Sequence, residues 1–221
     1  MKLVKLAALV VFIAFATSGA FAAGNVIFTH TDGSFTSSGV TSGTLSLTST
    51  LTGIQGLAPY VPDNTVTYPA SLGTLTMTTG TMNAGGNILT GATFTPGGNI
   101  TFSYSNGVVF TGSFTSASWT NVGSNTWQFT GTVMNGTLTV PGYYPAVIPT
   151  AVTISLSDVG SAPTVSGSGY SFADSQGTTN FPMPVLTPVP EPGTLTLLGG
   201  GLVGVAILTR RLRTKNEDLS K

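Results

Sequence analysis

The sequence predicts an all-β fold, either sandwich-like or a single curved antiparallel sheet, between two apolar chain ends. Short runs alternate apolar and polar residues, as where Ile100, Phe102 and Tyr104 are separated by Thr101 and Ser103. Such alternation is typical of half-buried strands. Gly, Asn and Pro punctuate the runs, and no helical spacing of apolar residues occurs between the two ends.

The expected strands follow one another at short intervals. They are placed at residues 44–48, 74–78, 100–104, 108–114, 126–130, 137–140 and 152–156. Asn106-Gly107 predicts a type I′ hairpin turn after the third of these. A Gly beside Thr recurs at intervals of 18 to 21 residues, at Gly73, Gly91, Gly112 and Gly131. This period suits successive hairpins or the coils of a β-solenoid, which is the alternative fold.

The N-terminal end has the organisation of a secretory signal peptide. Lys2 and Lys5 precede an uncharged apolar run at residues 6–16, and Ala20 and Ala22 form a small-x-small cleavage site. Cleavage is expected after Ala22, or after the next alanine. The segment 1–22 therefore implies the Sec translocon and signal peptidase as partners, with an all-β passenger domain at 23–160.

The C-terminal end combines a rigid motif, an apolar run and a basic cluster. A Pro/Ser/Gly-rich linker is expected at 161–188, followed by an uncharged run from Gly193 to Thr209. As a helix, those 17 residues would be roughly 25 Å long, against about 30 Å for a bilayer core. Arg210 and the cations after it predict a cytoplasmic end, since Lys and Arg beside a membrane segment mark that side. Residues 216–221 form a polar cytoplasmic tail.

Charge divides the chain into the same parts. All seven Lys and Arg lie at the two ends, and the body between them has four acidic residues and no cation. The four are Asp32, Asp63, Asp158 and Asp174. A body without a basic patch excludes nucleic acid as a partner, and it excludes electrostatic attraction to anionic lipid. The chain has no cysteine, so no disulfide stabilises the exported part.

The C-terminal end resembles the PEP-CTERM sorting signal of Gram-negative bacteria over about residues 188–215. Pro190, Glu191 and Pro192 match its recognition motif, and an apolar helix at 193–209 follows. The matching basic cluster, which would retain the chain in the membrane, is Arg210, Arg211 and Arg213. We therefore expect the sorting segment to cover residues 189–215.

This resemblance implies a partner and a location. Exosortase, a membrane-embedded transpeptidase-like cysteine protease, would recognise the motif and remove the tail near it. The precursor would be anchored transiently in the inner membrane, and the product would reach the cell surface or the extracellular matrix. The family is associated with biofilms and exopolysaccharide, which makes extracellular polysaccharide a further candidate partner.

Residues suited to catalysis are scarce. His30 is the only histidine, and Asp32 would lie on the same face of a strand. We interpret His30 as a surface residue, because no nucleophile motif accompanies it. The aspartates are widely spaced, so neither a metal site nor any cofactor is expected. The sequence therefore favours a non-enzymatic surface or matrix protein over an extracellular hydrolase.

Aromatic residues suggest a second function. Trp119, Trp127, Tyr143 and Tyr144 could form a stacking platform for sugars, as in a carbohydrate-binding module of the extracellular matrix. The competing interpretation places the tryptophans in the core and the tyrosines in a loop flanked by prolines.

Overall fold

The computed structural model describes residues 25–58, 60–148, 151–159, 162–182, 184, 186–189 and 199–206. Its twelve strands form one sheet in which neighbouring strands are antiparallel. The strands are β1 (Asn25–Ser37), β2 (Leu45–Gln55), β3 (Asn64–Thr65), β4 (Gly73–Thr79), β5 (Gly91–Phe94), β6 (Gly98–Tyr104), β7 (Val109–Gly123), β8 (Thr126–Thr139), β9 (Ala146–Ile148), β10 (Val152–Val159), β11 (Thr164–Ser166) and β12 (Gly169–Pro182).

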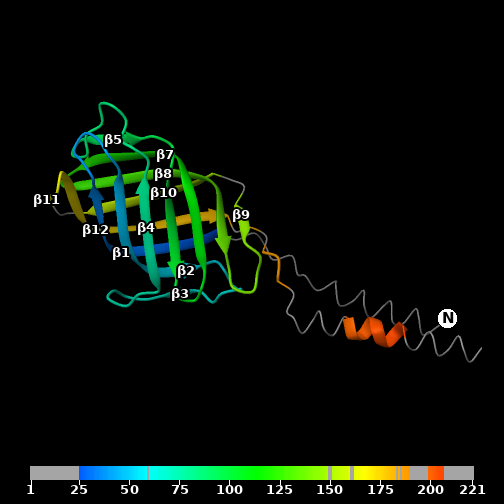
Figure 1. Ribbon diagram of the computed structural model, residues 1–221. Coiled ribbons are helices and arrows are strands. Elements are labelled where there is room, and N and C mark those ends of the chain that lie inside the picture. Colours follow the sequence, from blue (N-terminus) through cyan, green and yellow to red (C-terminus); the bar gives the residue numbers. More distant parts are fainter. Residues whose placement is uncertain are drawn as a thin grey trace, which may run out of the picture.

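Eight of the strands close into a barrel (Figure 1). Their order is β7-β6-β4-β2-β1-β12-β10-β8, and β8 pairs with β7 to complete the circle. The short strands β3, β5, β9 and β11 pair with β2, β7, β8 and β12, respectively. The all-β prediction is confirmed, and the sheet is curved and antiparallel. It closes on itself instead of forming a sandwich, and its antiparallel pairing differs from the parallel coils of a solenoid.

Bulges give the long strands the curvature that closure requires. On β1 the register with both neighbours shifts around Gly33, where Asp32 has a φ of 53°. On β8, Asn135 has a φ of 54° near a register shift against β7. A bulge bends its strand and increases the local twist. Each shift lies in the middle of a long strand, so the strand can continue around the barrel.

Two aromatic clusters fill the barrel interior, one toward each end. The first comprises Phe28, Phe102, Tyr104, Phe110 and Phe181. The second comprises Phe35, Phe114, Trp119, Trp127, Phe129 and Phe172. Glycine makes room for the rings at Gly131, where a Cβ would lie 2.5 Å from the ring of Phe114. Small residues facing large ones let the rings pack without voids.

The turns and strand lengths differ in detail from the sequence prediction. Asn106-Gly107 does connect β6 to β7, but only Gly107 has a positive φ, so the turn is not type I′. Positive φ at both positions is found at Ser124-Asn125, which connects β7 to β8. The two strands expected at 126–130 and 137–140 are parts of the single strand β8.

The expected linker at 161–188 contributes two strands, which corrects its assignment as linker. β11 and β12 lie within it, and β12 pairs with both β1 and β10. Within the expected helix at 193–209, residues 199–206 are helical. Among the described residues, no helix combines the length and the apolar character needed to cross a membrane.

Candidate functional site

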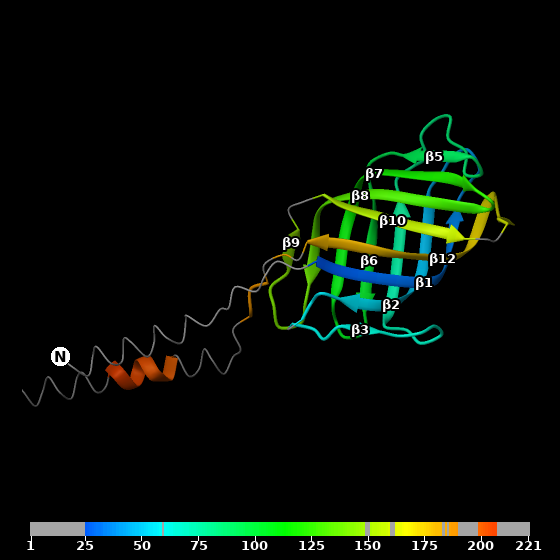
Figure 2. The same cartoon turned by 180° about the vertical axis from the view of Figure 1, so that it is seen from behind.

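The two chain ends leave the barrel side by side. Asn25, the first residue of β1, lies opposite Pro182, the last residue of β12, in an antiparallel register. Figure 2 shows the start of β1 beside the arrowhead of β12. The expected signal-peptidase site at Ala20 and Ala22 is outside the described residues, but Asn25 follows it by only three positions in the sequence. The first described residue and the end of the last strand therefore lie at the same end of the barrel.

The residues just before the expected sorting motif are held against this end. We call residues 186–189 the strap and residues 142–144 its docking loop. The Tyr144 N–H donates to the Thr187 carbonyl oxygen over 2.9 Å, and the Val189 N–H donates to the Gly142 carbonyl oxygen over 2.9 Å. Tyr143 and Pro188 form an antiparallel bridge between these two hydrogen bonds. The strap thus makes one short antiparallel pairing with the loop.

Pro188 stands at a position of this pairing that requires no donor. The two hydrogen bonds are made by the neighbours of the Tyr143–Pro188 pair, so neither member of the pair donates across it. Pro188 has no N–H to donate, and a non-hydrogen-bonded position is one where a strand tolerates proline. Pro188 therefore occupies the strap position at which its missing donor costs nothing.

Apolar contacts support the strap and its docking loop. Leu186 is only 6% exposed and belongs to the main hydrophobic core. The Tyr143 ring packs edge-on against Tyr60, with 4.8 Å between ring centroids. The loop is closed by the Tyr143 N–H, which donates to the Val140 carbonyl oxygen over 3.1 Å. One buried leucine, one ring pair and two strap hydrogen bonds hold this end of the chain.

The residues expected to form the sorting site lie just beyond. Pro190, Glu191 and Pro192 are outside the described residues, as are Arg210, Arg211 and Arg213. Their assigned roles stay predictions. The structure shows the position from which they depart, since Val189 is hydrogen-bonded to the barrel and Pro190 follows it directly.

His30 is buried, which corrects its interpretation as a surface residue. It is 3% exposed inside the barrel, and its Nδ1 lies 2.9 Å from the Ser49 hydroxyl. Ser49 donates to the Thr31 carbonyl oxygen over 2.9 Å, so its oxygen accepts the hydrogen of His30 Nδ1. Burial lowers the pKa of His30 from 6.5 to about 4, which keeps the ring neutral.

Asp32 does not join His30 in a site. The bulge places Asp32 at positive φ, and its carboxylate accepts a hydrogen bond from the exposed Tyr68 hydroxyl, whose pKa it raises. Ser49 is itself 3% exposed, so this serine and histidine are close together but enclosed. Among the side chains that the structure describes, no Ser–His–Asp arrangement forms at His30.

The other carboxylates do not assemble a metal site within the described part of the chain. Asp63 accepts a hydrogen bond from the Gly56 N–H over 2.8 Å and caps the turn after β2. Asp158 and Asp174 lie on β10 and β12. No group of three or more His, Asp or Glu side chains that could hold a metal ion is present among the residues described.

The expected sugar platform is not formed. Trp119 and Trp127 are 1% and 3% exposed and belong to the second aromatic cluster, so their ring faces are covered. Trp127 is near the start of β8, whereas Tyr143 and Tyr144 follow its far end. The length of β8, 14 residues at a rise of roughly 3.3 Å each, lies between them. The competing interpretation, core tryptophans and loop tyrosines, agrees with the structure.

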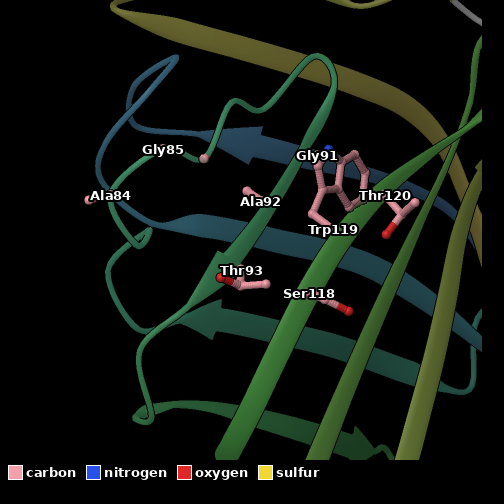
Figure 3. A pocket seen from close by; sticks show the side chains of 9 residues that line it. Ala84, Gly85, Gly91, Ala92, Thr93, Ser118, Trp119 and Thr120 are labelled. Carbon is pink, nitrogen blue, oxygen red and sulfur yellow. The ribbon is translucent and has the colours of Figure 1, made fainter.

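A shallow hollow of about 330 Å³ lies beside β5 and β7 (Figure 3). Gly85, Gly91, Ala92, Ser118 and Trp119 are among the residues that line it. The Trp119 Nε1–H donates to the Ile88 carbonyl oxygen over 2.8 Å, so it is not available to a ligand. The lining includes the hydroxyl side chains of Thr93, Ser118 and Thr120 and no ionisable side chain.

Sequence reasoning missed the docking loop as part of the functional region. Tyr143 and Tyr144 were singled out for sugar binding, yet the backbone groups around them hold the strap. A signal was present in the prolines: Pro141 and Pro145 flank the loop, and Pro184 and Pro188 flank the buried Leu186. Such spacing leaves few free donors, which favours a single short pairing over a long strand.

Comparison with known proteins identifies the C-terminal segment. Residues 188–211 match the family described as PEP-CTERM protein-sorting motif. No curated protein and no solved structure matches the chain. The match begins inside the strap, at Pro188, and continues through the expected motif and apolar run. The chain therefore carries a PEP-CTERM protein-sorting motif, which implies an exported protein that an exosortase processes.

Proposed function

We propose that this protein is a non-enzymatic component of the cell surface or extracellular matrix, delivered there by exosortase processing. The sorting motif at residues 188–211 carries this proposal. In the precursor, a membrane-anchored tail would hold the barrel outside the cytoplasm. After cleavage, the barrel would be released or transferred to the exterior, where it works as a structural or interacting part of a biofilm matrix.

The position of the chain ends supports this route. The signal peptide and the C-terminal membrane segment both have an end on the cytoplasmic side. The exported body must therefore begin and end at the same membrane. β1 starts at Asn25, directly opposite Pro182, where β12 ends. The barrel can therefore fold while both ends are still held at one membrane surface.

The environment of the titratable groups supports a non-enzymatic role. The only imidazole of the chain is enclosed in the barrel with its pKa lowered to about 4, where substrate has no access. Asp63 is engaged in a turn and Asp32 with an exposed tyrosine. The carbohydrate-binding alternative finds no support in the two tryptophans, because both are buried.

The test replaces the central acid of the motif. In a host that contains the exosortase, we expect Glu191→Gln to leave the protein in the membrane fraction as an unprocessed precursor. Glu217→Gln is the matched control, since it makes the same change beyond the basic cluster and should be processed normally. Equal processing of Glu191→Gln and the unaltered protein would refute the sorting assignment.

The matrix role is tested separately. Fractionation of the producing cells should place the processed barrel with the surface or extracellular polysaccharide layer, and deletion of its gene should change matrix cohesion. Recovery of the processed protein only as a free species, with no change of the matrix, would contradict this part of the proposal.

A further inference from the structure

The barrel pairs with the first two residues of the sorting segment. The family match starts at Pro188, which is paired with Tyr143, and the last strap hydrogen bond is made by Val189. Pro190 is the next residue in the chain. A single residue can span at most about 3.6 Å, so the motif begins within one residue of the folded barrel. The residues that precede the motif are not a free tether.

We propose that the docked strap masks the N-terminal flank of the sorting motif, so that exosortase cleaves only after residues 186–189 have left the docking loop. This inference rests on the proposed function. Gly142 and Tyr144 are its positioning residues, because their backbone groups bind the strap and have no role in the cleavage chemistry.

The masking follows from the backbone groups. An enzyme that cuts a peptide chain binds it extended, through the same N–H and C=O groups that pair strands. In the strap, the Val189 N–H and the Thr187 carbonyl are already bonded to the docking loop. Pro188 and Pro190 supply no donor. Between Thr187 and Pro190, the one N–H available to an enzyme is therefore occupied in the docked state.

The strap is suited to open without unfolding the barrel. Among the described residues, two backbone hydrogen bonds and the Leu186 side chain attach it, whereas β12 pairs along its length with β1 and β10. Segments with few buried contacts open locally while the core stays folded. When opening is fast compared with cleavage, the cleavage rate follows the open fraction. The strength of docking should then set the rate of processing.

Two substitutions at one residue separate the hydrogen bond from the side chain. Tyr144→Pro removes the N–H that donates to Thr187, whereas Tyr144→Ala removes the half-exposed ring and keeps the N–H. We expect Tyr144→Pro to be processed about three to ten times faster, the factor that one lost hydrogen bond gives. Tyr144→Ala should be processed at nearly the unaltered rate. The measurement is a pulse-chase of the full precursor in cells that contain the exosortase.

A reversible crosslink tests the same step in the opposite direction. Tyr143 and Pro188 form a non-hydrogen-bonded pair, the antiparallel geometry with the shortest Cα separation, which a disulfide can bridge. The natural chain has no cysteine, so Tyr143→Cys with Pro188→Cys gives a single possible disulfide within the chain. We expect the oxidised precursor to resist processing and the reduced form to be processed. Each single variant serves as the control for the substitution itself.

The outcomes distinguish this inference from the proposed function. Faster processing of Tyr144→Pro together with a block by the disulfide supports masking. Masking is overturned if Tyr144→Pro is processed more slowly than the unaltered protein or at the same rate. It is also overturned if the oxidised precursor is cleaved as fast as its reduced form, because exosortase would then read the strap in its docked form. If Glu191→Gln is processed like the unaltered protein, the proposed function fails, whatever the strap variants do.

Discussion

The barrel wall and the strap are both antiparallel β-structure, but they are held very differently. β12 pairs with neighbours on both sides, and its Phe172 and Phe181 are enclosed in the two aromatic clusters. The strap, a few residues further on, has one pairing partner, two hydrogen bonds and one buried leucine. The difference separates a part of the chain that must stay folded from a part that another enzyme must handle.

The largest expected effect is on the barrel itself. Phe28 is fully buried and contacts the rings of Phe102, Tyr104, Phe110 and Phe181. Phe28→Ala should lower the free energy of unfolding by about 3–5 kcal/mol, because it removes a large core side chain and leaves a cavity. Urea denaturation of the processed protein measures this change.

A matched control is Val165→Ala, since Val165 is 75% exposed on β11 and should change stability little. If Phe28→Ala were as mild as Val165→Ala, the barrel interior would not be the packed core described above.

The second effect is a loss of barrel stability in acid. The pKa of buried His30 is about 4, below its ordinary 6.5, so the unfolded chain binds the proton more tightly. The free energy of unfolding is therefore highest above pH 6.5, and it falls as the pH drops toward 4. The shift predicts a loss of about 3 kcal/mol at pH 4 relative to pH 7.

Denaturation midpoints measured between pH 7 and pH 4.5 test this prediction. His30→Gln removes the titrating group and should flatten the profile there, whatever its effect on absolute stability. An unaltered slope in His30→Gln would show that another group causes the acid sensitivity.

The smallest effect on global stability is expected for the strap. Leu186→Ala should reduce the protection of the Val189 amide against hydrogen exchange, because the side chain that holds the strap to the core is lost. The urea midpoint of the barrel should move far less than in Phe28→Ala. An equal loss of both would mean that strap and barrel unfold as one unit.

The sequence predicted the strands better than their closure. Alternation around Phe102 and Phe129 marked β6 and the first part of β8 correctly, because one face of each strand is buried. Closure depends on β8 pairing with both β7 and β10, which no local pattern specifies. The interior of β12 includes Gly177 and Thr179 beside its two phenylalanines, so this segment has the composition of a linker.

The reason for that composition lies on another strand. A Cβ at Gly177 would lie 2.7 Å from His30 Nε2, so glycine is required where the imidazole fills the barrel. The burial of His30 and the glycine opposite it explain each other, but only once β1 and β12 are known to pair. By contrast, the sorting motif was predictable from residues 188–211 alone, because it is read by an enzyme as sequence.

The most direct test of the account is the intact mass of the exported protein. Processing at the sorting motif predicts a C-terminus between residues 188 and 193, which leaves the barrel complete and removes the apolar run and the basic cluster. An exported protein that keeps its full tail to Lys221 would contradict the account.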